Sequence, residues 1–199
     1  EEAVAIAEKI GYPVMVRPSF VLGGRGMEVV YDSESMKGYM LAAVGVTPDR
    51  PILIDRFLRH ATEVEADAIS DGTTAFVPAV MEHIELAGIH SGDSACILPS
   101  KHISEKNLNT IKEYTRKIAV EMNVRGLMNM QYAIEDDKVY VIEANPRASR
   151  TVPLVSKVCN IRMVPLATEI ITSEITGRPS PVPQLKEQVI PNYGVKEAV

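Results

Sequence analysis

Two strand–turn–strand pairs constrain the fold of this chain more than any other feature of its sequence. TEVEADAIS (62–70) leads through an Asp-Gly dipeptide into TTAFVPAVMEHI (73–84), and that dipeptide favours a tight β-hairpin turn. LMNMQYAI (127–134) and KVYVIEA (138–144) flank a short acidic turn in the same way. Strands joined by short turns pair antiparallel, so the sequence predicts an α+β fold in which antiparallel sheet dominates over strand–helix–strand units.

The order of helices and strands predicts three regions. A helix, two strands around a glycine loop, a second helix and a third strand make a small α+β subdomain over 1–60. Residues 61–176 form a larger antiparallel-sheet subdomain with flanking helices, one of them capped by Ser104 and running to about Met122. Repeated prolines predict a linker or tail over 177–199.

Composition excludes several classes of protein. The formal net charge of −5 argues against a nucleic-acid surface, although a local anion pocket stays possible. Cys96 and Cys159 have no paired-thiol spacing, so we expect buried free thiols in a reduced, intracellular protein. No apolar run reaches the length of a membrane span and no leader opens the chain, which predicts a cytoplasmic location and no membrane partner.

Polar side chains converge on the second hairpin. If its turn takes three residues, Gln131 stands directly opposite Glu143, and strand alternation places Asn145 on the same face. Hard cations such as Mg²⁺ take oxygen ligands from one or two carboxylates, from water and from substrate phosphates. These residues therefore indicate a metal site that a nucleotide would complete.

Two arginines follow the same strand. Arg147 and Arg150 carry rigid, permanently charged guanidinium groups, which suit phosphate or carboxylate oxyanions. Together with a metal they would form a phosphoryl-transfer site. The alternative from spacing alone is that Glu143 caps the end of a hairpin and both arginines are solvated.

A glycine loop lies between two predicted strands. GGRG (23–26) is neither a Walker A loop nor a dinucleotide fingerprint, both of which lie between a strand and a helix. A glycine flap can still present backbone N–H groups to phosphate oxygens, and Arg17 on the preceding strand could add a cation. A simple hairpin turn and an exposed strand arginine are the alternatives.

Polar residues also occur in two other apolar neighbourhoods. Glu63 and Glu65 share one face of a strand, and His90-Ser91 lies in a glycine-flanked loop. Each pair could hydrogen-bond a ribose or a purine, or could be structural. No serine, cysteine or histidine has a base at nucleophile spacing, so covalent catalysis has no support.

Four long blocks resemble a known family. The chain is similar, through most of its length, to the large chain of carbamoyl-phosphate synthetase, an ATP-grasp ligase whose two similar halves phosphorylate bicarbonate and carbamate. The blocks that carry the resemblance are RPSFVLGGRGMEVVYD, MEHIELAGIHSGDSACILP, VRGLMNMQYA and IEANPRASRTVPLVSK. VLGGRGMEVVYD, HSGDSACILP and NPRASRTVPLVSK resemble the second, carbamate-phosphorylating half.

The resemblance implies a role for each matching residue. The nucleotide-binding positions would be Arg17, Gly23, Gly24, Arg56, Leu58, Glu63, Gly88, Ile89, His90, Ser91, Gln131 and Glu143. The Mg²⁺ or Mn²⁺ ligands would be Gln131, Glu143 and Asn145. Arg147 and Arg150 would be catalytic, facing the carbamate or carboxy-phosphate end.

The implied reaction transfers the γ-phosphoryl group of ATP to carbamate, giving carbamoyl phosphate for pyrimidine and arginine biosynthesis. The implied partners are the rest of the large chain and a glutamine-hydrolysing small chain. Family members have a further subdomain upstream, so we expect this chain to be a fragment that folds but makes carbamoyl phosphate poorly. The alternatives are the bicarbonate-phosphorylating half, another ATP-grasp carboxylate ligase, and a non-catalytic nucleotide-binding module.

Overall fold

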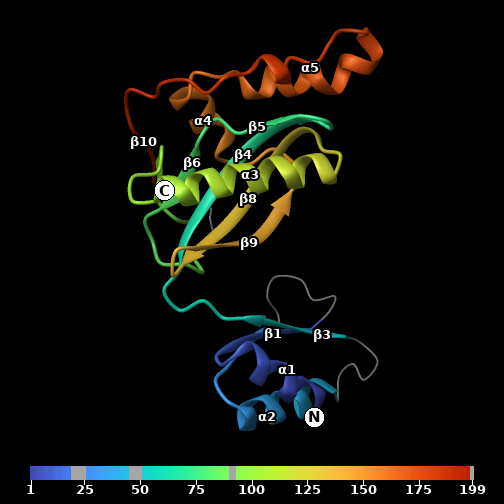
Figure 1. Ribbon diagram of the computed structural model, residues 1–199, viewed down its shortest axis with the longest axis vertical. Helices are drawn as coiled ribbons and strands as arrows, with labels where there is room; N and C mark the ends of the chain where they lie inside the picture. Colours follow the sequence, from blue (N-terminus) through green and yellow to red (C-terminus); the bar gives the residue numbers. More distant parts are fainter. Residues whose placement is uncertain (19–25, 45–50, 90–92, 198–199) are drawn as a thin grey trace. The chain divides into compact units, whose positions relative to one another are not determined.

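A computed structural model describes residues 1–18, 26–44, 51–89 and 93–197. The chain forms two compact units, Glu1–Arg59 and His60–Val199 (Figure 1). Both units combine helices with antiparallel sheet, so the α+β prediction is confirmed. Among the described residues, no helix combines the length and the apolar character that a membrane crossing requires.

The first unit is a three-stranded sheet with two helices. Its antiparallel strand order is β2-β1-β3, and Val14 and Val16 of the central strand are fully buried with Ala7, Val30 and Met36. The alternate residues of that strand are less buried, as expected for a sheet covered on one face. The elements are α1 (Glu2–Ile10), β1 (Val14–Pro18), β2 (Glu28–Val30), α2 (Ser33–Val44) and β3 (Ile52–Arg56).

The second unit is built on one antiparallel sheet. Its strand order is β10-β7-β6-β4-β8-β9, and β5 pairs with β4 beside this path. The strands are β4 (Thr62–Asp71), β5 (Ala75–Phe76), β6 (Val80–His83), β7 (Cys96–Leu98), β8 (Arg125–Glu135), β9 (Lys138–Asn145) and β10 (Gly194–Lys196). The helices are α3 (Glu105–Glu121), α4 (Val152–Val158), α5 (Met163–Thr176) and the 3₁₀ turn η1 (Val182–Gln184).

The central strand β4 presents two chemically different faces. Val64, Ala66 and Ala68 share a buried cluster with Ile111 and Ala119 of α3, which covers that face of the sheet. Ser104 caps α3 by accepting a hydrogen bond from the Asn107 amide, as the sequence predicts. The opposite face of β4 carries acidic residues at alternate positions, and it is this face that forms the site described below.

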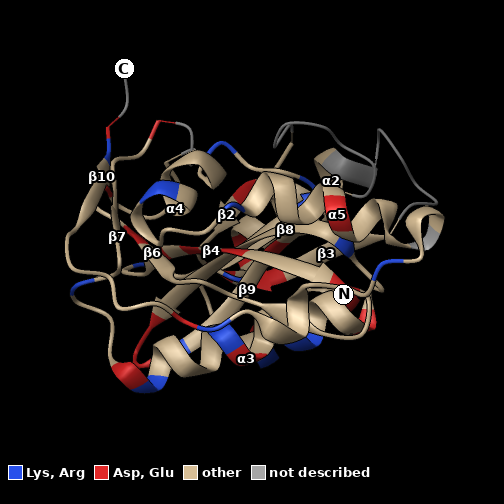
Figure 2. Ribbon diagram, turned by 90° about the horizontal axis from the view of Figure 1, so that it is seen from above, with Lys and Arg blue, Asp and Glu red and all other residues tan. Residues whose placement is uncertain are grey.

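Helices α4 and α5 cover only one end of that second face. Ile69 of β4 packs there with Val155 and Ile170, in a cluster to which Leu127 of β8 also belongs. Figures 1 and 2 together show α3 on one side of the sheet and α4 and α5 on the other. Along β4 itself the apolar residues of this face end at Ile69, and Asp67, Glu65 and Glu63 occupy the rest of it, while the apolar cluster continues over Met81 and Cys96 of β6 and β7.

The structure differs from the sequence-based expectation in the tail. Residues 177–199 were expected to be a linker, yet Val182 is buried in the core and β10 extends the sheet edge by pairing with β7. Lys112 and Arg116 of α3 also form ion pairs with Glu187. The prolines correctly predict little regular secondary structure in this segment, but a segment without regular structure can still pack against the core.

In the β8–β9 hairpin, Gln131 pairs with Glu143 as expected, but the turn and the register differ from those assumed. Its turn has two residues, Asp136 and Asp137, both with positive φ, whereas a three-residue turn was expected. A β-bulge next to Gln131 then shifts the register by one residue. The two differences cancel, so Gln131 does pair with Glu143.

Candidate active site

One row of side chains crosses three strands. Glu65 of β4 pairs with Gln131 of β8, which pairs with Glu143 of β9. The Gln131 Nε2 donates to Glu65 Oε1 at 3.4 Å. The predicted juxtaposition of Gln131 and Glu143 is therefore confirmed, and Glu65 adds a buried carboxylate to the same row.

This row lies in the wall of a cavity of about 410 Å³ within the second unit. Acidic, basic and amide side chains line it, which is typical of a site for a charged ligand rather than for an apolar one. Its lining residues are Glu63, Glu65, Gly88, Ile89, Asn129, Gln131, Glu143, Arg147, Ser149, Arg150, Thr151 and Lys196.

Eight of the residues singled out from the sequence line this cavity. They come from β4, from the segment after β6, from β8, from β9 and from the segment that follows β9. They are Glu63, Glu65, Gly88, Ile89, Gln131, Glu143, Arg147 and Arg150.

The other nucleotide-binding candidates lie elsewhere in the chain. Arg17, Arg56 and Leu58 belong to the first unit, where Arg17 forms an ion pair with Asp55 on the neighbouring strand. Arg56 is exposed and Leu58 is half-buried. The candidates that lie outside the described residues are Gly23, Gly24, His90 and Ser91.

Asn145 occupies the next row of the sheet. It pairs with Asn129, which pairs with Asp67, so it shares the face of Gln131 and Glu143 as predicted. It is not among the described residues that line the cavity. Its Nδ2 is buried and has no hydrogen-bond partner in the described part of the chain.

The segment after β9 places the two arginines. The Arg147 amide donates to the Asn145 carbonyl oxygen at 2.8 Å, and this bond turns the chain directly after the strand. Arg147 and Arg150 are both exposed, and both line the cavity. The two guanidinium groups therefore line the same cavity as Glu65 and Glu143 and stay accessible to solvent.

A neutral histidine lies behind the acidic residues. His83 is 4% exposed, and its Nδ1 and Nε2 lie 3.5 Å from Glu63 Oε2 and 3.9 Å from Glu65 Oε1. Burial, and after it the charge of Lys196, lower the pKa of His83 to about 4, although Glu85 opposes the shift. At neutral pH the ring therefore adds no positive charge to the cavity wall.

Glu63 connects the sheet to the segment after β6. Its Oε1 accepts a hydrogen bond from the Gly88 amide at 3.0 Å. This bond ties Gly88 and its neighbour Ile89 to the cavity wall. A carboxylate at this position could instead accept hydrogen bonds from ribose hydroxyls.

Sequence reasoning missed several residues of the site. Asn129 precedes Gln131 by two positions, so strand alternation could have placed it on the same face. Ser149 and Thr151 lie on either side of Arg150 in the block IEANPRASRTVPLVSK. They could have been listed as site candidates together with the two arginines. Lys196 gave no local signal, because the pairing of β10 with β7 brings it in from a segment that reads as linker.

The side chains of the cavity could bind a hard divalent cation only if phosphate oxygens or water supplied further coordinating atoms. Glu143 and Gln131 offer oxygen atoms on adjacent strands, which is the donor type that Mg²⁺ and Mn²⁺ prefer. Among the described residues, no group of three His, Cys, Asp or Glu side chains could hold a metal ion. A cation here would need phosphate oxygens or water to complete its coordination.

The two cysteines take no part in the site. Cys96 and Cys159 are both free and buried, as expected from their spacing. Burial raises the pKa of each thiol to about 11. Both groups are therefore protonated and unreactive at neutral pH.

Solved structures with a similar fold include carboxylases. A pyruvate carboxylase from Rhizobium etli matches with a TM-score of 0.71 at 22% identity, over 95% of this chain and 17% of that one. The biotin carboxylase domain of a 2-oxoglutarate carboxylase from Hydrogenobacter thermophilus matches with a TM-score of 0.67 at 18% identity, over 98% and 43%. These likenesses show that the fold is ATP-grasp.

Curated relatives are more similar in sequence. The carbamoyl phosphate synthase large chain of Archaeoglobus fulgidus is 53% identical over 199 residues, which are 100% of this chain and 18% of that protein. The corresponding large chain, C-terminal section, of Aquifex aeolicus is 53% identical over 170 residues, covering 85% and 32%. This chain thus spans less than a third of either relative.

A family profile gives the same result for most of the sequence. Residues 1–176 match the family described as carbamoyl-phosphate synthase L chain, ATP binding domain. The match includes the first unit and most of the second, and it ends where α5 ends. The chain belongs to the family of carbamoyl-phosphate synthase large chains, as part of the ATP-binding domain.

Proposed function

We propose that this chain binds ATP together with Mg²⁺ or Mn²⁺ and, within a full-length large chain, phosphorylates carbamate to carbamoyl phosphate. The observation that carries the proposal is the convergence of Gln131, Glu143, Arg147 and Arg150 on one cavity. Membership of the ATP-binding family supports a nucleotide as the ligand. The bound MgADP in the 2-oxoglutarate carboxylase structure is compatible with that ligand.

A divalent cation, when bound, would neutralise part of the charge on the phosphates. Glu143 and Gln131 would hold it, and Asn145 in the adjacent row would join them. The buried Asn145 Nδ2 without a partner is a donor, so it would donate to a phosphate oxygen of the nucleotide, and Oδ1 is the atom that could face the cation. Glu63, Gly88 and Ile89 would bind the nucleoside end.

The arginines would act on the groups that react. A carbamate oxygen attacks the γ-phosphorus, a new O–P bond forms, and the bond to the β–γ bridging oxygen breaks as ADP leaves. Arg147 and Arg150 would orient the two anions and offset their mutual repulsion in the transition state. The reaction needs no protein nucleophile, in keeping with the lack of one in the sequence.

The choice of carbamate over bicarbonate rests on sequence similarity. The quoted blocks resemble the second half of the large chain, and one relative is itself a C-terminal section. The bicarbonate-phosphorylating half is the alternative. The proposed partners are the rest of the large chain and a glutamine-hydrolysing small chain, in the cytoplasm and within pyrimidine and arginine biosynthesis.

The test uses the full-length large chain that carries this sequence. The proposed reaction can be assayed in reverse, as ATP formation from carbamoyl phosphate and ADP. We expect Glu143→Gln to lower that rate about 100-fold or more, because it removes the charge that would face the cation. Bicarbonate-dependent ATP hydrolysis by the other half of the large chain should be little changed.

A matched control is Glu113→Gln, which alters an exposed carboxylate on α3, across the sheet from the cavity. It should leave both rates unchanged. If Glu143→Gln instead abolishes bicarbonate-dependent hydrolysis and spares ATP formation, the chain is the bicarbonate half. If neither rate changes, the cavity is not a phosphoryl-transfer site.

A further inference from the structure

A buried carboxylate lies beneath the arginine segment. Asp67 is 2% exposed and belongs to the face of β4 that also carries Glu63 and Glu65. Its pairing partner on β8 is Asn129, one row away from Gln131. Asp67 is not among the described residues that line the cavity, so it sits behind the cavity wall.

Both oxygens of Asp67 are used by the segment that carries the arginines. Oδ1 accepts hydrogen bonds from Ser149 Oγ at 2.7 Å and from Asn129 Nδ2 at 3.0 Å. Oδ2 accepts one from Thr151 Oγ1 at 2.5 Å. Ser149 and Thr151 flank Arg150, so the carboxylate holds the backbone on both sides of that arginine.

The two hydroxyl oxygens also lie close to each other. Ser149 Oγ and Thr151 Oγ1 lie 2.7 Å apart, and the Thr151 amide donates to Ser149 Oγ at 3.2 Å. Thr151 is the N-cap residue of α4, so the network fixes the entry into that helix. The segment from the end of β9 to α4 therefore has its main side-chain anchor in Asp67.

Packing does not explain an acid at this position. Neighbouring core positions of β4 hold alanine, valine and isoleucine, and a buried carboxylate is costly unless it is fully hydrogen-bonded. Burial raises the pKa of Asp67, while the bonds from Thr151, Asn129 and Ser149 and the charge of Arg147 oppose that shift. The cost of burial is explained if the residue holds a structure that function needs.

We propose that Asp67 is a positioning residue for phosphoryl transfer, which acts by fixing the backbone that presents Arg147 and Arg150 to the cavity. This inference rests on the proposed function. An arginine displaced by about 1 Å can lose about 100-fold in rate, because its effect depends on geometry at the transition state. The nucleoside end of the cavity, on Glu63, Gly88 and Ile89, is held separately.

The experiment compares Asp67→Ala and Asp67→Asn in the full-length large chain, with ATP formation from carbamoyl phosphate and ADP as the assay. Asp67→Ala should lower kcat about 10- to 100-fold and change the KM for ADP by less than about 3-fold. Asp67→Asn should recover kcat to within a few-fold, because the Thr151 hydroxyl can rotate to accept from the new amide.

The decisive comparison is Asp67→Ala in an Arg150→Ala background. If Asp67 acts through Arg150, the double variant should be about as slow as Arg150→Ala alone. Fully multiplicative losses would overturn the positioning role while leaving the proposed function intact. An Arg150→Ala variant with normal kcat would instead show that the proposed function itself fails, and the inference with it.

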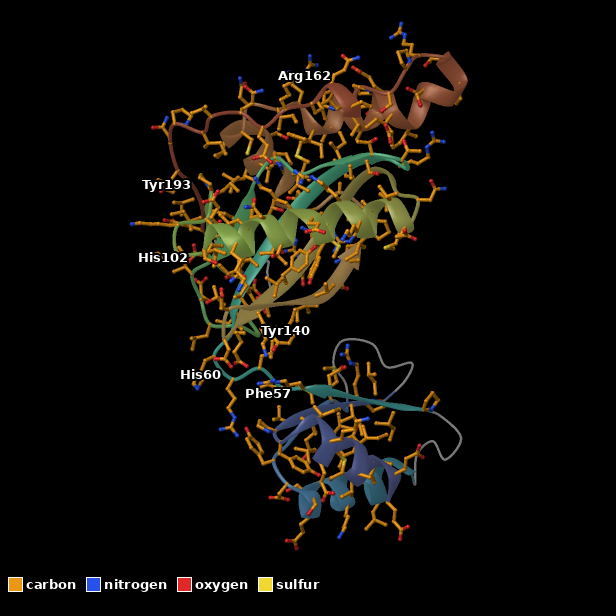
Figure 3. The ribbon with its side chains drawn as sticks, in the orientation of Figure 1. Phe57, His60, His102, Tyr140, Arg162 and Tyr193 are labelled. Atoms are coloured by element: carbon orange, nitrogen blue, oxygen red, sulfur yellow. The ribbon has the colours of Figure 1, made fainter. Side chains whose placement is uncertain are left out.

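Glu82→Ala is the matched control for the loss of a buried carboxylate. Glu82 is 6% exposed and accepts three hydrogen bonds, from the amides of Lys101 and His102 and from His102 Nδ1, each at 2.8 Å. It pairs with Val64 on the α3 side of the sheet, and His102 lies near the beginning of α3 (Figure 3). Its loss should reduce stability but leave kcat unchanged.

Ser149→Ala keeps the test open should Asp67→Ala fail to fold. This variant removes one anchor and leaves the carboxylate with two donors. It should lower kcat with little change in the KM for ADP. A normal kcat in Ser149→Ala, or an equal loss of kcat in Glu82→Ala, would overturn the proposal.

Discussion

At the scale of single residues, the pKa of each buried acid depends on how far its hydrogen bonds compensate for the loss of hydration. Asp67 and Glu82 are both buried carboxylates with three hydrogen bonds, yet their pKa values shift in opposite directions. Burial raises the pKa of Asp67, whose donors are hydroxyl and amide side chains. Burial also opposes ionisation of Glu82, but two backbone amides and His102 lower its pKa overall.

His83 shows the corresponding effect in a base, because burial disfavours its charged form and lowers its pKa. Its folded pKa of about 4 lies below the ordinary value of 6.5, so the unfolded chain takes up a proton at higher pH than the folded one. The stability that neutral His83 contributes is therefore complete above pH 6.5. It is lost as the pH falls towards 4.

This shift predicts a specific pH dependence. Between pH 7 and pH 5, His83 should account for a loss of about 2 kcal/mol in the unfolding free energy. His83→Gln should remove that part of the dependence, because glutamine does not titrate. Urea unfolding of both proteins at the two pH values measures it, and parallel pH profiles for the two would contradict the assignment.

At the scale of elements, the tail is part of the sheet. Gly194 begins β10, and a Cβ built at this position would lie 2.2 Å from Val158 Cγ2 and 3.2 Å from Leu154 Cδ1. The close approach of β10 to α4 therefore requires a residue without a side chain. Two residues later the strand carries Lys196 to the cavity.

Gly194→Ala should destabilise the second unit by about 1–3 kcal/mol, because two branched side chains would have to move. Gly38→Ala is the matched control, since Gly38 lies within α2 and a Cβ there meets nothing within 4 Å. That substitution should stabilise the first unit by about 0.5–1 kcal/mol. Hydrogen exchange resolves the two units, and a neutral Gly194→Ala would show that the contact is not as tight as described.

The elements that could be predicted are those with local causes. Ser104 and the apolar stripe that follows it specify α3, and alternation along β4 and β8 specifies which residues share a face. Gln131 and Glu143 pair as predicted only because the two-residue turn and the bulge offset each other. That agreement depended on a compensation that no local pattern encodes.

The parts that could not be predicted depend on contacts between distant segments. Lys196 reaches the cavity through pairing with a strand about 100 residues earlier in the chain, and proline-rich sequence gives no sign of it. Asp67 could have been found from its alternation with Glu63 and Glu65. Its role could not, because the partners Ser149 and Thr151 are more than 80 residues away.

At the scale of the whole molecule, two compact units share the residues proposed to bind ATP. Glu63, Gln131, Glu143, Arg147 and Arg150 belong to the second unit, whereas Arg17, Arg56 and Leu58 belong to the first. The chain also spans only 18% of the Archaeoglobus large chain. Complete activity is therefore a property to be measured on the full-length large chain.

The most direct test of the central claim is a crystal structure of that full-length large chain with ADP and Mn²⁺. An anomalous manganese peak should lie within about 2.5 Å of oxygen atoms of Glu143 and Gln131, with the ADP phosphates in the same cavity and Arg147 and Arg150 facing them. A structure in which ADP and manganese occupy this domain elsewhere, with no metal at Glu143, would contradict the account.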